Sequence, residues 1–221
     1  MKRAVIIVAG GSGTRMQSAT PKQFLLVCGR PILMHTIEKF AQTGEVRIVV
    51  VLPAEHIGYW QELCKKYDFK REHSVVAGGK TRFESVRNGL MTIDEKKCLV
   101  GVHDGVRPLV SAETIGRCYD EAQKYGTAVP AMKSTESVRL TDGEKNRAID
   151  RNTVMMIQTP QVFKYEILRK AYEQPYTELF TDDASVVERA GYAIHLCEGN
   201  TTNIKITTPS DLRIAECFMG N

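Results

Sequence analysis

The chain has 221 residues, 43% of them hydrophobic, which is enough for one compact domain with a buried core. Its 30 Lys and Arg residues against 26 Asp and Glu give a formal net charge of +4, too small and too dispersed for a nucleic-acid-binding protein. The six cysteines form no CxxC pair, so the sequence indicates neither a zinc site nor a disulfide framework, and we expect reduced thiols in the core.

The first residues, MKRAVIIVAGG, carry two basic side chains before an apolar run, as secretory signals do. The run is too short for a signal, and the glycines after it indicate a turn, so we predict a buried strand over residues 4–9. No segment approaches the roughly 18 apolar residues of a membrane span. We therefore expect a soluble, cytoplasmic protein.

Short β-branched runs alternate with longer helical patterns as the chain continues. After the first strand, the runs lie at 46–53, 73–79, 98–104 and 126–132. Helical patterns lie at 31–44, ending at Gly44, and at 82–91 and 112–125. This alternation predicts an α/β fold, a mostly parallel, doubly wound sheet with helices on both faces.

Residues 133–152, KSTESVRLTDGEKNRAIDRN, interrupt this alternation. They are polar and charged, with an Asp-Gly turn between two short alternating segments, so we predict a projecting β-hairpin arm. Beyond it we predict a helical region at 181–190, a last strand at 203–207 and a terminal helix from Pro209. We interpret residues 1–221 as one domain that carries this arm.

A glycine-rich segment, AGGSGTRM, follows the first predicted strand directly. Gly10, Gly11 and Gly13 allow backbone N–H groups to approach an anion closely, so the loop can hold phosphates. A tight turn or a dinucleotide site are the alternatives for such a loop. The spacing does not match GxGxxG, because Met16 stands at the third glycine position.

Cationic side chains follow the glycines closely. Nucleotidyl transfer requires positive charge on the α-phosphate and on the departing pyrophosphate, and Arg15 and Lys22 can both turn towards one triphosphate. Asp104 ends an apolar strand, at the sheet edge where open α/β sheets bind ligands. Its carboxylate can hold Mg²⁺ on the phosphates or orient a second substrate, the alternative being a capping residue in a turn.

At this point the sequence resembles a known family, the 2-C-methyl-D-erythritol 4-phosphate cytidylyltransferases of isoprenoid biosynthesis. The similarity covers nearly the whole chain. Its motifs in order are AGGSGTRM, PKQF, AGGKTRFESV, HDGVRP, DRN, QTPQVF, TDDAS and NIKIT. The resemblance implies a Rossmann-like nucleotidyltransferase fold, CTP and a small polyol phosphate as substrates, and a homodimer formed through the 133–152 arm.

The resemblance also implies roles for residues in the nucleotide half. The loop residues Ala9, Gly10 and Gly11 would approach the nucleotide, with Gly13 in the same loop. Arg15 and Lys22 would stabilise the pentavalent phosphorus, and Mg²⁺ would bridge the phosphates. The residues expected around the cytosine and ribose are Gly79, Ser85, Asp104 and Gly105. Family members usually have alanines where this chain has Gly105 and Val106.

A second set of residues is implied for the acceptor's phosphate. Arg107, Arg151, Thr181 and Lys205 would surround it, because Arg offers a planar fork for phosphate oxygens and Lys a point charge. Arg151 and Ser137 lie on the arm and would serve the partner subunit's site. The family usually has Thr where this chain has Ser137.

Other conspicuous side chains indicate structural roles. His35, His56, His73 and His195 have no ligand partners at suitable spacing, and Trp60 could cover the sheet edge. His103 would point to the side of its strand opposite Asp104 and is a packing or orienting residue. A phosphomonoester nucleophile needs no dedicated general base, which agrees with the absence of a Ser/His/Asp set.

Three alternatives stand beside the methylerythritol reading. A ribitol 5-phosphate cytidylyltransferase of cell-wall polymer synthesis shares the glycine loop, PKQF and NIK, but DRN and TDDAS favour the methylerythritol branch. A regulatory protein with a degenerate nucleotide site would not be expected to keep the charged residues named above. An oxidoreductase would need GxGxxG and an acidic residue about 20 positions later.

Overall fold

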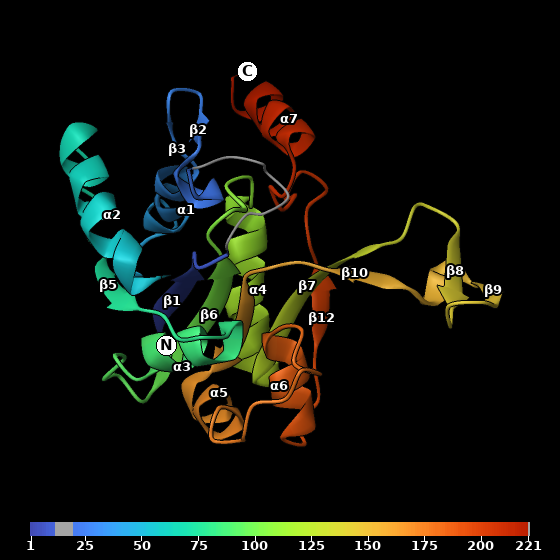
Figure 1. Ribbon diagram of the computed structural model, residues 1–221. Coiled ribbons are helices and arrows are strands. Elements are labelled where there is room, and N and C mark those ends of the chain that lie inside the picture. Colours follow the sequence, from blue (N-terminus) through green and yellow to red (C-terminus); the bar gives the residue numbers. More distant parts are fainter. Residues whose placement is uncertain (12–19, 221) are drawn as a thin grey trace.

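The computed structural model describes residues 1–11 and 20–220. Its centre is an eight-stranded sheet among these residues, with the order β10-β7-β11-β6-β1-β4-β5 and β12 beside β7 (Figure 1). The strands are β1 Lys2–Val8, β4 Arg47–Leu52, β5 Ser74–Ala77, β6 Cys98–Asp104, β7 Thr127–Lys133, β10 Met155–Ile157, β11 Gln161–Lys164 and β12 Leu196–Glu198. Only β10 and β11 pair antiparallel within it, so the prediction of a mostly parallel sheet is confirmed.

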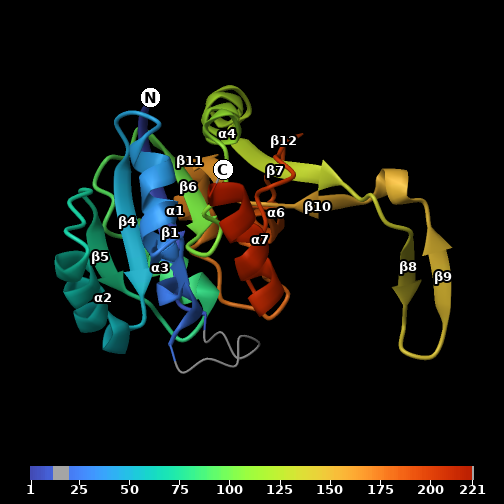
Figure 2. The same cartoon turned by 90° about the horizontal axis from the view of Figure 1, so that it is seen from above.

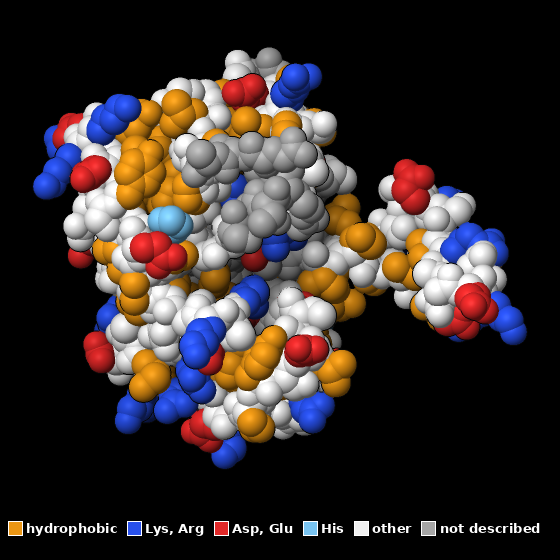
Figure 3. All heavy atoms as spheres, viewed as in Figure 1, with side chains coloured by type: hydrophobic (Ala, Val, Ile, Leu, Met, Phe, Trp, Pro, Cys, Tyr) orange, Lys and Arg blue, Asp and Glu red, His pale blue; other side chains and the backbone are white. Residues whose placement is uncertain are grey.

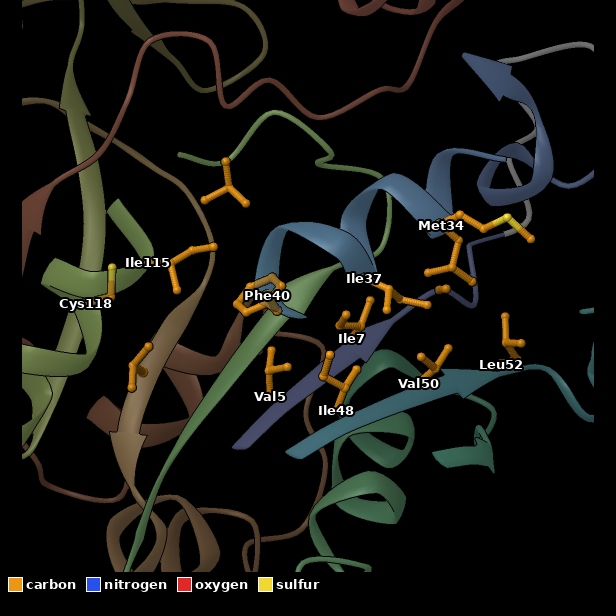
Figure 4. Packing of buried hydrophobic residues seen from close by; sticks show 14 of the residues in the cluster. Val5, Ile7, Met34, Ile37, Phe40, Ile48, Val50, Leu52, Ile115 and Cys118 are labelled. Carbon is orange, nitrogen blue, oxygen red and sulfur yellow. The ribbon is translucent and has the colours of Figure 1, made fainter. Parts of the chain in front are cut away.

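Helices cover both faces of the sheet. Alternate residues of a strand point to opposite faces, and β1 sends Val5 and Ile7 to one core and Ala4 and Ile6 to the other. The first core contains side chains from α1 (Ile32–Ala41), α2 (Ala54–Lys66) and α4 (Ala112–Tyr125), as Figure 4 shows for part of it. The second contains side chains from α3 (Arg82–Leu90), α5 (Tyr165–Ala171) and α6 (Asp183–Arg189).

The central strand β6 is buried along its whole length, because both of its faces carry helices. Parallel pairing with β1 aligns Val8 with Asp104, so the two strands end together. The glycine loop that follows β1 and the carboxylate at the end of β6 therefore meet at one edge of the sheet.

The predicted arm is confirmed as a hairpin that leaves the body (Figures 1 and 2). Strands β8 (Val138–Thr141) and β9 (Asn146–Ile149) pair antiparallel in a sheet of their own, with Gly143 at positive φ in the turn. Most of the side chains of this hairpin are exposed.

The predicted last strand at 203–207 is wrong, because these residues form no strand pairing. Their polar groups are bonded elsewhere: the Ile206 N–H donates to the Val106 carbonyl, and the Asn203 side chain donates to the Thr159 carbonyl. The edge of β7 is instead occupied by β12. The terminal helix α7, Pro209–Met219, begins where predicted.

Other elements were not predicted. A two-residue hairpin joins β2 (Leu26–Val27) and β3 (Arg30–Pro31) through Cys28 and Gly29, both at positive φ. A short 3-10 turn, η2 (Lys22–Phe24), precedes it, and η3 (Arg151–Thr153) follows the arm. The described helices include none long and apolar enough to cross a membrane.

The cysteines are all free thiols, as expected. Cys98 and Cys118 are buried and Cys64 and Cys197 are half-buried, but the prediction of core thiols is wrong for the other two. Cys28 is exposed in the hairpin turn, and Cys217 is exposed on the terminal helix.

Trp60 on α2 is fully buried, stacks with Phe24 and meets Phe69 edge-on, while its Nε1–H donates to Nε2 of His73 at 3.0 Å. Removing so large a buried side chain leaves a cavity and an unpaired imidazole nitrogen. We expect Trp60→Ala to lower the free energy of unfolding in urea by about 3–5 kcal/mol. Glu62→Ala, on the exposed face of the same helix, should change it by about 0.5 kcal/mol or less. Equal effects of the two changes would contradict this packing role.

Candidate active site

Two adjoining pockets open at the carboxyl edge of the parallel strands. The first, which we call the nucleotide pocket, is bordered by the end of β1, the end of β4 and the N-terminus of α3. The second, the acceptor pocket, is bordered by β6, by the segment between β10 and β11, and by the start of α6. Arg82, Asp104 and Lys205 line both pockets.

The glycine-rich segment forms one wall of the nucleotide pocket. Ala9, Gly10 and Gly11 line it together with Lys22. A Cβ added to Gly11 would lie 3.0 Å from Cε and 3.2 Å from Nζ of Lys22, so the lysine side chain lies against this backbone. The structure thus brings together the described part of the predicted phosphate-binding loop. Arg15 and Gly13 lie outside the described residues.

The opposite wall is the turn that leads into α3. Thr81 and Glu84 form a capping box, and the Gly79 N–H donates to Ser85 Oγ at 3.1 Å. A Cβ at Gly79 would lie 2.3 Å from Glu84 Cβ, so glycine is required there to fold the turn against the helix. Gly79 and Ser85 both line the pocket.

Gly105 is required for packing as well. A Cβ added to Gly105 would lie 2.8 Å from Ala9 Cβ. The Gly105 N–H donates to the Val8 carbonyl at 2.8 Å. The residue joins the ends of β1 and β6, whereas Val106 next to it lines the nucleotide pocket. Gly105 itself is not among the described residues that line either pocket.

Asp104 is the centre of a cluster of cations. Its Oδ2 lies 3.1 Å from both Arg107 Nε and Lys205 Nζ, and its Oδ1 lies 4.0 Å from Arg82 Nε. Burial opposes ionisation of this carboxyl, but Arg82, Lys205 and Arg107 outweigh it and hold its pKa well below the usual range. Asp104 is therefore a carboxylate at every physiological pH.

Arg82 was not predicted as a site residue. Its Nη2 donates to Oδ2 of Asp183 at 2.6 Å, and the Tyr172 hydroxyl donates to Oδ1 of the same carboxylate at 2.6 Å. Burial disfavours the charge on Arg82, but Asp183 and then Asp104 raise its pKa above the ordinary value. Asp183 is fully buried, so the pair is a buried ion pair with a further hydrogen bond.

The acceptor pocket contains three of the residues predicted to bind the acceptor's phosphate, namely Arg107, Thr181 and Lys205. Arg107 is fixed by a second bond, from Nη1 to the Asn203 carbonyl at 2.8 Å. Four other polar residues that were not predicted also line this pocket: Gln158, Thr159, Gln161 and Asp182. All four lie within the QTPQVF and TDDAS motifs, and membership of these motifs is the signal in the sequence that points to them.

The arm residues lie apart from both pockets. Arg151 donates from Nη1 to the Thr135 carbonyl at 3.0 Å and is exposed, and Ser137 is exposed in the hairpin. Neither is among the described residues that line a pocket of this chain.

His103 supports the site from behind. Its Nε2 lies 3.1 Å from the Arg107 carbonyl and its Nδ1 lies 3.0 Å from Thr159 Oγ1, which also accepts the Asp104 N–H. A neutral ring, donating from Nε2 and accepting at Nδ1, satisfies all three groups. His103 is therefore an orienting residue, as predicted. None of the other histidines is among the described residues that line the two pockets.

Burial lowers the pKa of His103 from 6.5 to about 4. A depressed histidine pKa gives stability that is complete above pH 6.5 and is lost as the pH falls towards 4, because the unfolded chain takes up the proton first. The loss should approach about 3 kcal/mol. Urea unfolding of the protein and of His103→Gln between pH 7.5 and 4 would measure it. Parallel pH curves for the two proteins would contradict the assignment.

A divalent cation can bind at this site with a single ligand from the protein, the Asp104 carboxylate. Among residues 1–11 and 20–220 there is no group of three or more His, Cys, Asp or Glu side chains that could hold a metal ion. Mg²⁺ is commonly held by one or two carboxylates together with substrate phosphates. Within the described part of the chain, the ion-pair partner of Asp104 Oδ1 is Arg82, at 4.0 Å, so the donor set fits such a shared site.

Two pockets that share three charged side chains suit an α/β enzyme that transfers a phosphate-linked group between two small ligands. A family model described as 2-C-methyl-D-erythritol 4-phosphate cytidylyltransferase matches residues 3–221. The chain belongs to this family, which is a family of nucleotidyltransferases.

Individual relatives agree over the full length. The enzyme of that name from Porphyromonas gingivalis is 54% identical over 219 residues, 99% of this chain and 98% of the relative. The one from Bacteroides thetaiotaomicron is 49% identical over 220 residues, 99% of this chain and all of the relative. These names favour the methylerythritol reading over the ribitol alternative.

Solved structures agree with the fold. The enzyme of the same name from Thermus thermophilus superposes with a TM-score of 0.79 at 30% identity, over the full length of both chains. A 4-diphosphocytidyl-2C-methyl-D-erythritol synthase from Anaerococcus prevotii gives a TM-score of 0.84 at 28% identity, over all of this chain and 96% of the other.

Proposed function

We propose that this protein transfers the cytidylyl group of CTP to 2-C-methyl-D-erythritol 4-phosphate, giving 4-diphosphocytidyl-2-C-methyl-D-erythritol and pyrophosphate. The observation that carries the proposal is the junction of the two pockets at Arg82, Asp104 and Lys205. Two phosphate-bearing substrates bound in these pockets would meet at positive charge, where the new phosphate bond has to form.

The reaction is an in-line displacement. A phosphate oxygen of the acceptor attacks the α-phosphorus of CTP, and the bond from that phosphorus to the pyrophosphate oxygen breaks, with the electron pair leaving on pyrophosphate. Lys22, and Arg15 by the family resemblance, neutralise charge on the α-phosphate and on the leaving group. No side chain has to remove a proton, because the phosphomonoester is already ionised at neutral pH.

Each pocket has its own binding residues. Ala9, Gly10, Gly11 and Gly13 would receive the triphosphate, and the turn with Gly79 and Ser85 would receive the cytosine. Arg107, Thr181 and Lys205 would hold the acceptor's phosphate through charge-assisted hydrogen bonds.

We assign Mg²⁺ to Asp104. Asp104 would hold the ion, which would supply positive charge to neutralise the phosphates. The contribution of the chain is to keep Asp104 ionised and fixed in place through Arg107 and Lys205. The six free thiols suit a reducing compartment, and we propose the cytoplasm as the place of action.

The arm is the element proposed to build a homodimer. Large apolar side chains are exposed on it and at its root: Leu140 on β8 is 50% exposed, and Met156 and Ile157 on β10 are 57% and 40% exposed. Figure 3 shows apolar side chains where the arm joins the body. Burying them against a second copy would be favourable. In that dimer Arg151 and Ser137 would reach the partner subunit's acceptor pocket, which agrees with their position outside the pockets of their own chain.

The test is pyrophosphate release by the purified protein with CTP and Mg²⁺, with methylerythritol 4-phosphate, ribitol 5-phosphate or no acceptor. We expect rapid release only with methylerythritol 4-phosphate, and its loss in Lys205→Ala but not in Lys124→Ala, an exposed lysine of α4. Release only with ribitol 5-phosphate would show that the protein is a ribitol 5-phosphate cytidylyltransferase of cell-wall polymer synthesis. Release with neither acceptor would refute the proposed reaction.

A further inference from the structure

The junction between the two pockets contains a cation with no assigned role. Of the residues that line both pockets, Asp104 and Lys205 already have proposed functions, and Arg82 has none. Its guanidinium therefore borders the place where the phosphate of one substrate must meet that of the other.

Arg82 is held there by a dedicated anchor. Asp183 is fully buried, and its two carboxylate oxygens are occupied by Arg82 Nη2 and by the Tyr172 hydroxyl, each at 2.6 Å. Arg82 is also the first residue of α3, where the helix dipole disfavours a cation. The helix dipole therefore opposes Arg82, and its charge depends on Asp183, a buried carboxylate 101 residues away. The stability of α3 alone does not explain a cation at this position.

The contacts of Asp104 show what this anchored cation faces. Oδ2 of Asp104 is occupied by Arg107 and Lys205, whereas Oδ1 faces Arg82 Nε at 4.0 Å. That distance is too long for a hydrogen bond but short enough for a strong charge interaction in a poorly solvated site. Arg82 thus attracts Oδ1 towards the junction, where no described residue donates a hydrogen bond to this oxygen and it can contact a ligand.

We propose that Arg82 is a positioning residue for the transfer step: anchored by Asp183, it sets the orientation of the Asp104 carboxylate at the point where the two substrates meet. The inference rests on the proposed placement of the nucleotide and the acceptor in these two pockets. It predicts an effect on the rate of transfer rather than on the binding of either substrate alone.

The single change Arg82→Met would leave Asp183 buried without its partner and could unfold the protein. The informative variant is therefore Arg82→Met with Asp183→Asn, in which both charges are removed and the amide can still accept the Tyr172 hydroxyl. We expect this double variant to melt within a few degrees of the wild type but to lose about 10- to 100-fold in kcat. The KM for CTP should stay within about threefold of the wild-type value, because the glycine loop and Lys22 remain.

Two further variants separate positioning from structure. Arg82→Lys keeps the charge but loses the fork that reaches both carboxylates, so its kcat should lie between those of the wild type and the double variant. Tyr172→Phe removes only the hydrogen bond from the Tyr172 hydroxyl to Asp183 and leaves Arg82 in place. It should lower the melting temperature while kcat stays close to the wild-type value.

A folded double variant that retains wild-type kcat would overturn the role of Arg82. Lys22→Ala, measured beside it, tests the underlying placement separately. If Lys22→Ala loses activity while the double variant does not, only the inference about Arg82 fails. If Lys22→Ala is also fully active, the proposed placement of the substrates fails, and the role of Arg82 fails with it.

Discussion

Replacing Lys22 by alanine should lower kcat by about 10²- to 10³-fold, the loss typical when one preorganised partner of a developing negative charge is removed. The lysine lies against the backbone of Gly11 in the nucleotide pocket, where the α-phosphate and the departing pyrophosphate are proposed to bind. The measurement is steady-state pyrophosphate release with both substrates varied.

The matched control is Lys65→Ala, an exposed lysine on the last turn of α2, which should keep wild-type kcat and KM. Thermal melting of both variants checks that the fold is intact. A Lys22→Ala enzyme whose KM for CTP rises while kcat is unchanged would show that Lys22 binds the ground state and the transition state equally.

The second large effect concerns the arm. If Arg151 completes the site of the partner subunit, a mixed dimer of one Lys22→Ala chain and one Arg151→Ala chain contains one complete site and one doubly damaged site. Such dimers, purified through two different tags after co-expression, should show about half of the wild-type activity, although each parent homodimer has lost most of its own.

Inactive mixed dimers would mean that Arg151 acts within its own chain, because each site would then carry one defect. Failure to isolate any mixed dimer would contradict dimerisation itself. Arg147→Ala, another exposed arginine of the arm, is the control and should leave both assembly and activity unchanged.

Local patterns were sufficient to predict most of the sheet. β1, β4 and β6 are apolar runs buried on both faces, and their β-branched content and length allow a strand to be recognised without its partners. The segment at 203–207 carries the same local signal but forms no strand, since its neighbours are a loop and polar side chains. Whether a segment pairs as a strand depends on which segments lie beside it in the folded chain, and the local sequence does not contain this information.

The candidate site divides in the same way. Gly11, Lys22 and Asp104 lie in short motifs whose chemistry can be recognised locally, and the structure gathers them at one pocket. Arg82 and Asp183 are 101 positions apart, and each resembles an ordinary charged residue near a helix start. Only the folded chain shows that they form a buried pair beside the site.

The two pockets are built from different parts of the chain. Apart from Lys205, the nucleotide pocket takes its described lining from residues 8–106, whereas the acceptor pocket takes much of its lining from 157–161 and 181–182. Substitutions in these two short segments would alter the shape and hydrogen-bonding groups offered to the polyol without touching the walls that receive the nucleotide. Acceptor preference can therefore diverge among relatives, or be redesigned, while recognition of the cytidine nucleotide is inherited unchanged.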